Sequence, residues 1–278
     1  MHCHHCGKKV VLHKKCPKCG IGEIKPFGIG SQFVEELVKK MFTKSRVQRL
    51  DTDIDHVNKN EEKQNDIIDD FNAGEINILV GTKMLFRSID FQKVGLIGIV
   101  FAENLLNIPD YRASETSFQF IYSLIMNMKS QSTGKKVVIQ TYQPDHPSIK
   151  ALENNNFSDL YHREILDRKE LDYPPFANVI KIGFLSRKRE KTLKQAWHFI
   201  DYAQKKELIK KYKLSYQLNK SNVIVVQENN RYVVNFILKL SFRNRIICDF
   251  KKELKKYISN YRSNEVKLFI DVDPVKMY

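Results

Sequence analysis

The chain has 278 residues, 42% of them hydrophobic and 28% charged, which is enough for one large domain or two to three small domains with a buried core. It contains no run of about 18 apolar residues, which predicts that it has no membrane span. Its polar start argues against a signal peptide, so we expect a cytoplasmic protein. A net charge of +15 favours a polyanionic partner such as nucleic acid. The same lysine excess is typical of proteins from AT-rich genomes, so the charge alone does not decide.

The chain begins with two Cys-x-x-Cys pairs, each followed by glycine and separated by a short basic segment. In a reducing compartment such pairs bind a metal more often than they form disulfides, and this spacing is typical of a zinc ribbon. We expect residues 1–25 to hold one structural Zn²⁺ with no open position, through the four thiolates of Cys3, Cys6, Cys16 and Cys19. The four nearby histidines are spare donors. Four ordinary buried thiols are the alternative, which is disfavoured because so short a segment has no core.

Helices and strands alternate in the next part of the chain. Apolar side chains recur at helical spacing in residues 31–42, a short strand is predicted for 47–51, and a helix ending at a glycine is predicted for 61–74. Two apolar runs, 76–82 and 94–102, predict buried strands. The second run is apolar almost throughout, as in a parallel strand covered on both faces.

The alternation continues with a helix over 110–128, a strand over 135–142 and a helix over 146–155. Such an order is typical of a doubly wound α/β domain with a parallel sheet. We therefore predict an α/β domain over residues 26–160.

The C-terminal part follows another order. After a charged helix predicted for 161–172, the segment YPPF ends the alternation, because two prolines fit neither a helix interior nor a central strand. Strand, helix, strand, strand, helix and strand then follow between residues 178 and 272, an order typical of the split βαβ or ferredoxin-like arrangement. We expect a small α+β domain over 161–278, with Cys248 as a small core residue.

Several segments, in this order, resemble the PriA family of bacterial primosomal replication-restart helicases. They are CHHCG, CPKCG, PFGIGSQFVEELVKKMF, ILVGTKML with the DF that follows it, PDYRASETSFQ, VIQTYQPDHPSI, YPPF and DVDP. The resemblance covers essentially the whole chain. It implies the C-terminal half of such a protein, truncated and degenerate, with a zinc region embedded in the second RecA-like helicase lobe and a small C-terminal domain after it.

The resemblance also implies partners and cofactors. Members of the family are ATP-dependent DNA helicases that use ATP and Mg²⁺ and act on forked or single-stranded DNA. Other primosome proteins, the single-strand-binding protein and a separately encoded N-terminal half are further expected partners, and no membrane is expected.

The resemblance assigns a DNA- or nucleotide-facing turn to Gly81 and Thr82, where the family reads G-T-Q-M and this chain has lysine in place of the glutamine. Arg87 stands where the family has lysine. Asp51 and Asp53 match the family's R-[IM]-D-x-D at a strand end, at the edge of a parallel sheet where ligands gather. Aspartates that only cap a loop would look the same.

The chain departs from the family at positions that serve ATP hydrolysis. It contains no G-x-x-x-x-G-K-[ST] phosphate loop, which in the family belongs to the first lobe. The family's Q-V-A-G-R-A-G-R stretch falls on residues 123–130, where Asn127 and Ser130 replace the arginines and Met126 and Lys129 replace the glycines. Such arginines stabilise charge in the transition state, so we assign no catalytic residue and expect no ATP hydrolysis by this chain alone.

Three interpretations of function stay open. The chain is a PriA-like DNA-binding protein, a helicase subunit acting with a separately made N-terminal half, or a non-functional remnant. The resemblance implies eight cysteines for two zinc ions in the family, so the four cysteines here would have to regroup around one ion or leave two half-sites. Arg231, Tyr232 and FRNR at 242–245 are candidates for stacking on single strands, although a half-buried sheet residue is the favoured interpretation of any one tyrosine.

Overall fold

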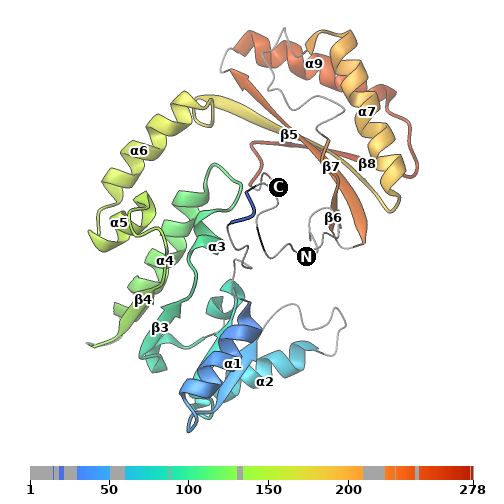
Figure 1. Cartoon of the computed structure of the whole chain (residues 1–278). Coiled ribbons are helices and arrows are strands. Elements are labelled where there is room, and N and C mark those ends of the chain that lie inside the picture. The colour runs from blue at the N-terminus through green and yellow to red at the C-terminus, as the bar shows by residue number, and fades with distance from the viewer. Residues whose placement is uncertain are drawn as a thin grey trace. The chain divides into compact units, whose positions relative to one another are not determined.

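A computed structural model of the chain describes residues 15, 19–21, 30–50, 60–87, 89–129, 134–208, 223–228, 230–241, 244–275 and 277. The chain divides into two compact units (Figure 1). Residues 26–108 and 113–157 are named here the parallel-strand unit, and residues 1–25, 109–112 and 158–278 the antiparallel-sheet unit. Among the described residues, no helix is long and apolar enough to cross a membrane.

The described residues in the first half of the parallel-strand unit form two strands and two helices. They are α1 (Ser31–Met41), β1 (Val47–Leu50), α2 (Asn60–Ala73) and β2 (Ile78–Gly81). The two strands pair in parallel, with Val47 opposite Ile78. Gly74 follows α2 with a φ of 88°, a left-handed conformation that glycine adopts without steric cost, so the helix ends where the sequence predicts.

The second half of this unit is built around α4. Its elements are η1 (Lys83–Arg87), η2 (Phe91–Lys93), β3 (Leu96–Ile99), α3 (Glu103–Leu106), α4 (Ala113–Lys129), β4 (Lys136–Ile139) and α5 (Pro147–Glu153). Strands β3 and β4 pair in parallel. Leu124 and Met128, one turn apart on α4, are buried in one cluster with Ile97 of β3. Burying each such side chain stabilises the unit by about 1.5–3 kcal/mol.

The parallel strands differ from the prediction in two ways. The sequence predicts one doubly wound sheet, whereas the described residues form two separate parallel pairs, β1–β2 and β3–β4. The prediction that β3 is covered on both faces is wrong, because Leu96 of β3 and Val138 of β4 are 61% and 54% exposed. An apolar run indicates that a strand has apolar side chains. It does not indicate which other segment covers each face.

The largest segment of the antiparallel-sheet unit starts within α6 (Phe157–Glu170), whose first residue still belongs to the other unit. The YPPF segment lies between α6 and the first strand of the sheet. The remaining elements are β5 (Ala177–Ser186), α7 (Arg189–Lys205), β6 (Val226–Glu228), β7 (Arg231–Ser241), α9 (Asn244–Asn260) and β8 (Lys267–Val272). The sheet order is β6-β7-β5-β8, and each neighbouring pair is antiparallel. This is the split βαβ topology that the order of elements predicts.

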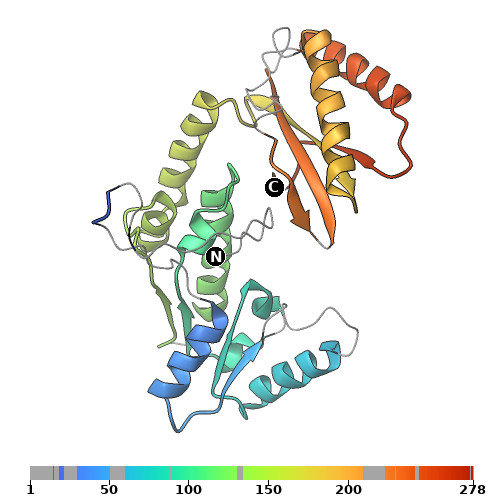
Figure 2. The same cartoon turned by 45° about the vertical axis from the view of Figure 1, so that its right-hand side comes forward.

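The core of this unit lies on one face of its sheet. Figures 1 and 2 both show α7 and α9 on the same face. Phe184 of β5 and Phe236 of β7 are buried there, with ring centroids 6.0 Å and 5.5 Å from that of Phe199 on α7. Alternate residues of the strands therefore point into a single aromatic core, as the period of two in a strand requires.

The prediction that Cys248 is a core residue is wrong, because its side chain is exposed on α9. The buried residues of this helix include Phe250, Leu254 and Tyr257, spaced by four and three positions along one side. Cys248 precedes Phe250 by two positions. At about 100° per residue these two side chains point in very different directions around the helix axis.

The opposite face of the sheet contains a close approach between β5 and β8. Gly183 pairs with Phe269, and a Cβ added at Gly183 would lie 1.9 Å from the Cζ atom of the Phe269 ring. The phenyl ring therefore lies over the glycine, and the absence of a side chain at Gly183 is what allows this packing. Gly98 of β3 is different, because a Cβ there would meet nothing within 4 Å.

We predict that Gly183→Ala lowers the free energy of unfolding of the antiparallel-sheet unit by about 1–3 kcal/mol, because the Phe269 ring must move out of a packed position. Urea unfolding followed by circular dichroism measures the change. Gly98→Ala is the matched strand control and should cost no stability. The double variant Gly183→Ala, Phe269→Ala should lose less than the two single changes added together; a strictly additive loss would contradict the contact.

Candidate functional site

The turn after β2 contains two of the predicted site residues, and both are exposed. Gly81 ends the strand at a close approach to β1, where an added Cβ would lie 2.2 Å from the carbonyl oxygen of Leu50 and 2.8 Å from Leu85. This close contact with the backbone of β1 is by itself enough to explain why residue 81 is a glycine. Thr82 follows, and its carbonyl oxygen accepts a hydrogen bond of 3.1 Å from the backbone N–H of Leu85. The turn is therefore fixed, with its hydroxyl-bearing residue at the carboxyl end of a parallel strand.

The helical turn after Thr82 packs on α4. The Nζ atom of Lys83 lies 4.5 Å from the centre of the Phe120 ring, and the Phe86 ring meets Phe120 edge to face at 5.4 Å. Cation–π contacts of this kind are worth about 0.5–1 kcal/mol at exposed sites. Lys83 therefore has a packing role. Arg87 ends η1, and its side chain lies outside the described part of the structure.

Helix α4 occupies most of the stretch that the sequence aligns with the family's arginines. The helix continues without a break to Lys129. Asn127 is on its exposed side, whereas Leu124 and Met128 are buried in the core. Glycines would favour a break in this helix, and none is present in it. Ser130 lies outside the described residues. Where described, this segment is a packed helix without arginine.

Five other predicted site residues cannot be placed by the structure. Asp51 and Asp53 lie outside the described residues, although β1 ends directly before them. Three of the four predicted zinc ligands also lie outside: Cys3, Cys6 and Cys16. Cys19 is described and exposed. Among the described residues there is no group of three or more His, Cys, Asp or Glu side chains that could hold a metal, so the zinc site stays a prediction.

The carboxyl ends of β3 and β4 carry a polar arrangement that the sequence analysis did not identify. Glu103 is 3% exposed, and its Oε1 atom accepts hydrogen bonds from the Thr141 hydroxyl at 2.7 Å and from the backbone N–H of Tyr142 at 2.6 Å. Its Oε2 atom is buried without a hydrogen-bond partner. Phe101, two residues before, has a φ of 60°, an uncommon conformation for a side chain of this size. A carboxylate directly after an apolar strand was the available signal.

Hydrogen bonding keeps Glu103 ionised. Burial by itself would raise the pKa of this carboxyl group, but hydrogen bonds from Thr141, from its own backbone and from the backbone of residues 142 and 143 together hold the pKa below its ordinary value of 4.5. The charged form is therefore the one that organises the turn after β4.

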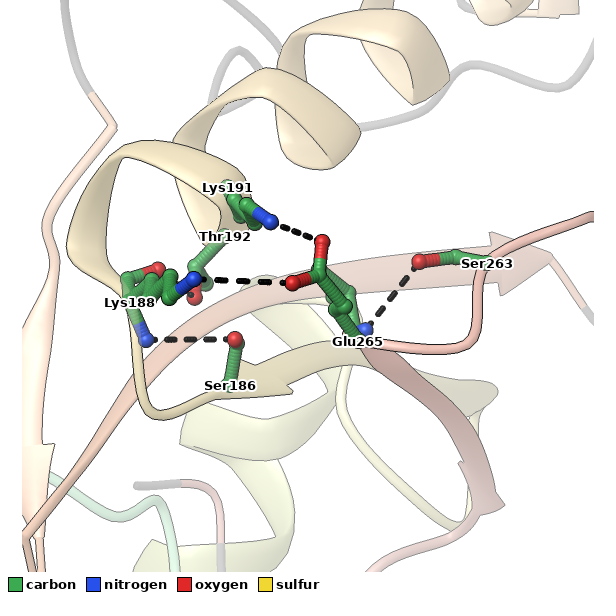
Figure 3. A network of polar contacts seen from close by, with 7 residues as sticks. Ser186, Lys188, Lys191, Thr192, Ser263 and Glu265 are labelled. Atoms are coloured by element: carbon green, nitrogen blue, oxygen red, sulfur yellow. Dashed lines mark hydrogen bonds and ion pairs between the residues drawn. The ribbon is translucent and has the colours of Figure 1, made fainter.

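A second polar cluster ties the start of α7 to the loop before β8 (Figure 3). Glu265 forms an ion pair with Lys191 and lies 3.6 Å from Nζ of Lys188. Thr192 Oγ1 donates to the carbonyl oxygen of Lys188 at 3.2 Å. The hydrogen bond from Lys191 lowers the pKa of Glu265, and the same contact raises the pKa of Lys191. Both lysines therefore form ion pairs that connect two parts of the fold.

Several aromatic rings of the antiparallel-sheet unit already have contacts on their faces. Tyr111 stacks on Tyr173 at 4.6 Å between ring centroids, with Arg112 4.6 Å from the Tyr111 ring and Lys239 3.6 Å from the Tyr173 ring. Tyr232 packs against the core. This agrees with the interpretation of Tyr232 as a half-buried sheet residue. Arg231 is exposed at the start of β7, and the side chains at 242–245 are not described.

Known proteins resemble the chain along nearly its whole length. Residues 27–111 match the family of helicase conserved C-terminal domains. The chain is 29% identical to the replication restart protein PriA of Bacillus subtilis over 278 residues, which is 99% of this chain and 33% of that protein. It is 27% identical to the replication restart protein PriA of Borreliella burgdorferi, over 99% of this chain and 40% of that protein.

The replication restart protein PriA of Synechocystis is 34% identical over 196 residues, which is 69% of this chain and 23% of that protein. The chain thus spans about a third of the length of the curated relatives it matches. These relations confirm the family resemblance predicted from the sequence. The helicase C-terminal match is consistent with the expected C-terminal half.

We predict that Glu103 titrates below pH 4.5, and that the backbone N–H signal of Tyr142 in an NMR pH titration reports the midpoint. Because the pKa in the folded state is lowered, the stabilisation from Glu103 is present above about pH 4.5 and is lost as the pH falls through the lower, folded-state value. Glu103→Gln serves as the control and should show no inflection. A midpoint above pH 4.5 in the unaltered chain would contradict the hydrogen-bonded carboxylate.

Proposed function

Because the chain belongs to the family of PriA replication restart proteins, we propose that it is a replication-restart protein that binds DNA through phosphate contacts, with a preference for forked or single-stranded DNA. The relation over 99% of the chain carries this proposal. The net charge of +15 supports it, because a basic chain releases counterions when it binds phosphates.

The exposed side of α9 is one source of that charge. Four lysines, Lys251, Lys252, Lys255 and Lys256, are exposed along this helix. Lys256 lies 2.7 Å from Glu253, and Lys252 lies 3.8 Å from Asp249. Within three turns of α9 there are thus four lysines and two acidic residues. This excess of positive charge is available to a polyanion.

We further propose that the chain alone does not hydrolyse ATP. The continuous helix α4 supports this, because Asn127 stands on it where the family has an arginine and no glycine interrupts it. A neutral amide cannot stabilise developing charge on a phosphate as a guanidinium does. ATP and Mg²⁺ are therefore cofactors of the family that we do not assign to this chain.

Structural zinc remains part of the proposal for residues 1–25. Four thiols in two Cys-x-x-Cys pairs are a donor set that fits Zn²⁺: Cys3, Cys6, Cys16 and Cys19. Bound zinc would fold a segment too short to have a core of its own. With four protein ligands the ion would have no open position, so no chemistry is assigned to it.

We predict that the chain binds a labelled forked oligonucleotide in fluorescence anisotropy titrations, with an affinity that falls at least tenfold between about 50 and 200 mM salt. Lys251→Ala with Lys255→Ala should weaken binding to all sequences and reduce the slope of log K against log salt by up to about 2. Cys248→Ser, on the same helix, is the neutral control. Affinity that does not change with salt, or equal affinity for blunt duplex, would contradict the proposal.

We predict about one zinc ion per chain after purification without chelators, measured by inductively coupled plasma mass spectrometry. Cys3→Ser with Cys16→Ser removes one thiolate from each pair and should abolish the bound zinc. Cys248→Ser should leave it unchanged. A metal-free chain, or zinc retained in the double variant, would exclude the proposed ligand set.

A further inference from the structure

The side chain of Tyr142 is largely exposed to solvent, unlike those of the tyrosines packed in the core. It is 73% exposed and lies three residues after the end of β4, at the carboxyl end of a parallel strand. Its backbone is held by the hydrogen bond to Glu103, and its ring contacts the Phe101 ring edge to face at 6.3 Å. An exposed aromatic ring on a fixed backbone loses little conformational freedom when a ligand stacks on it.

The backbone around this ring is held in an unusual conformation. Phe101 is buried in the left-handed region, which costs of order 1–3 kcal/mol for a residue other than glycine. The Ala102 N–H donates to the carbonyl oxygen of Gln140 at 3.0 Å, which joins the end of β3 to the end of β4. Strain of this kind persists where the surrounding structure fixes it, and it is commonest at binding and catalytic sites.

The polar side chains of this turn are suited to bases. Gln143 Nε2 lies 3.5 Å from Asn107 Oδ1, and its backbone N–H donates to Thr141 Oγ1 at 3.0 Å. Asn107 and Gln140 are exposed. Amide side chains can both donate to and accept from the edges of nucleobases, whereas phosphates are bound mainly by cations. The chemistry at this turn therefore matches a base better than a phosphate.

We propose that the turn after β4 is a base-stacking site, in which a nucleobase of a single strand stacks on the Tyr142 ring. The amides of Asn107 and Gln143 contact the edge of that base. Glu103 is a positioning residue, because it holds the backbone of the turn and does not contact the base. This site rests on the proposed function, since it adds a sequence-tolerant, uncharged contact to phosphate binding located elsewhere on the chain.

The experiment compares variants of the full chain by anisotropy with labelled oligothymidylate, and with an abasic deoxyribose-phosphate oligomer of the same length. Tyr142→Ala should bind oligothymidylate about five- to tenfold more weakly, with an unchanged slope of log K against log salt, because an uncharged contact releases no counterion. Tyr142→Phe keeps the ring and should bind as the unaltered chain does. All these proteins should bind the abasic oligomer equally.

Controls separate stacking from general effects on folding. Tyr161→Ala removes another exposed tyrosine, on α6, and should leave the affinity unchanged. Glu103→Ala should weaken binding of oligothymidylate, whereas Glu103→Gln keeps an acceptor for Thr141 and Tyr142 and should restore it.

The outcomes distinguish the site from the proposed function. If the unaltered chain binds oligothymidylate and Tyr142→Ala binds it equally well, the stacking site is excluded and DNA binding stands. If Tyr142→Ala weakens binding to the abasic oligomer to the same extent, the ring does not act on bases and the site is again excluded. If the unaltered chain binds neither oligomer, the proposed function and the site fail together.

Discussion

The packing of Leu124 and Met128 against Ile97 is the contact on which the parallel-strand unit depends. It fixes α4 on the pair β3–β4 and keeps the last turns of that helix in the core. Phe86, Phe91 and Phe120 pack around the same cluster, so the turn after β2 is positioned through it as well. The apolar residues that stabilise the unit thus also place residues 123–129 in a packed helix.

The parallel pairing of β3 with β4 brings their carboxyl ends together, which lets Glu103 contact Thr141 and Tyr142. A buried carboxylate is costly unless it is hydrogen-bonded, and here two donors from the turn after β4 offset that cost on one oxygen. The turn is fixed as a consequence, and an aromatic side chain is left exposed on it. In the turn after β2, by contrast, Gly81 is explained by the close approach of β1 alone. A backbone contact thus determines the conformation of the turn after β2, whereas a buried carboxylate determines that of the turn after β4.

The antiparallel-sheet unit separates its apolar and charged surfaces. Its aromatic core lies between the sheet and the helices α7 and α9, so the outer sides of those helices are free to carry lysines. Two lysines near the start of α7 form ion pairs with Glu265, so their positive charge is partly neutralised within the unit. Solvent and salt screen exposed ion pairs of this kind, so the stability of the fold depends on its core and not on them. Positive charge can therefore accumulate on this unit without a large cost in stability.

The sequence by itself determined the local features of this protein and its family. Periodicity located most helices and strands, the order of elements predicted the split βαβ topology of β5 to β8, and glycine marked the end of α2, because each of these depends on residues close together in the chain. The family followed from short segments in a fixed order. The tertiary structure alone decided that β1–β2 and β3–β4 are separate pairs, that Leu96 is exposed, and that Glu103 meets Thr141. Those outcomes depend on which distant segments come into contact, and burial and hydrogen bonding act between residues that no local pattern relates.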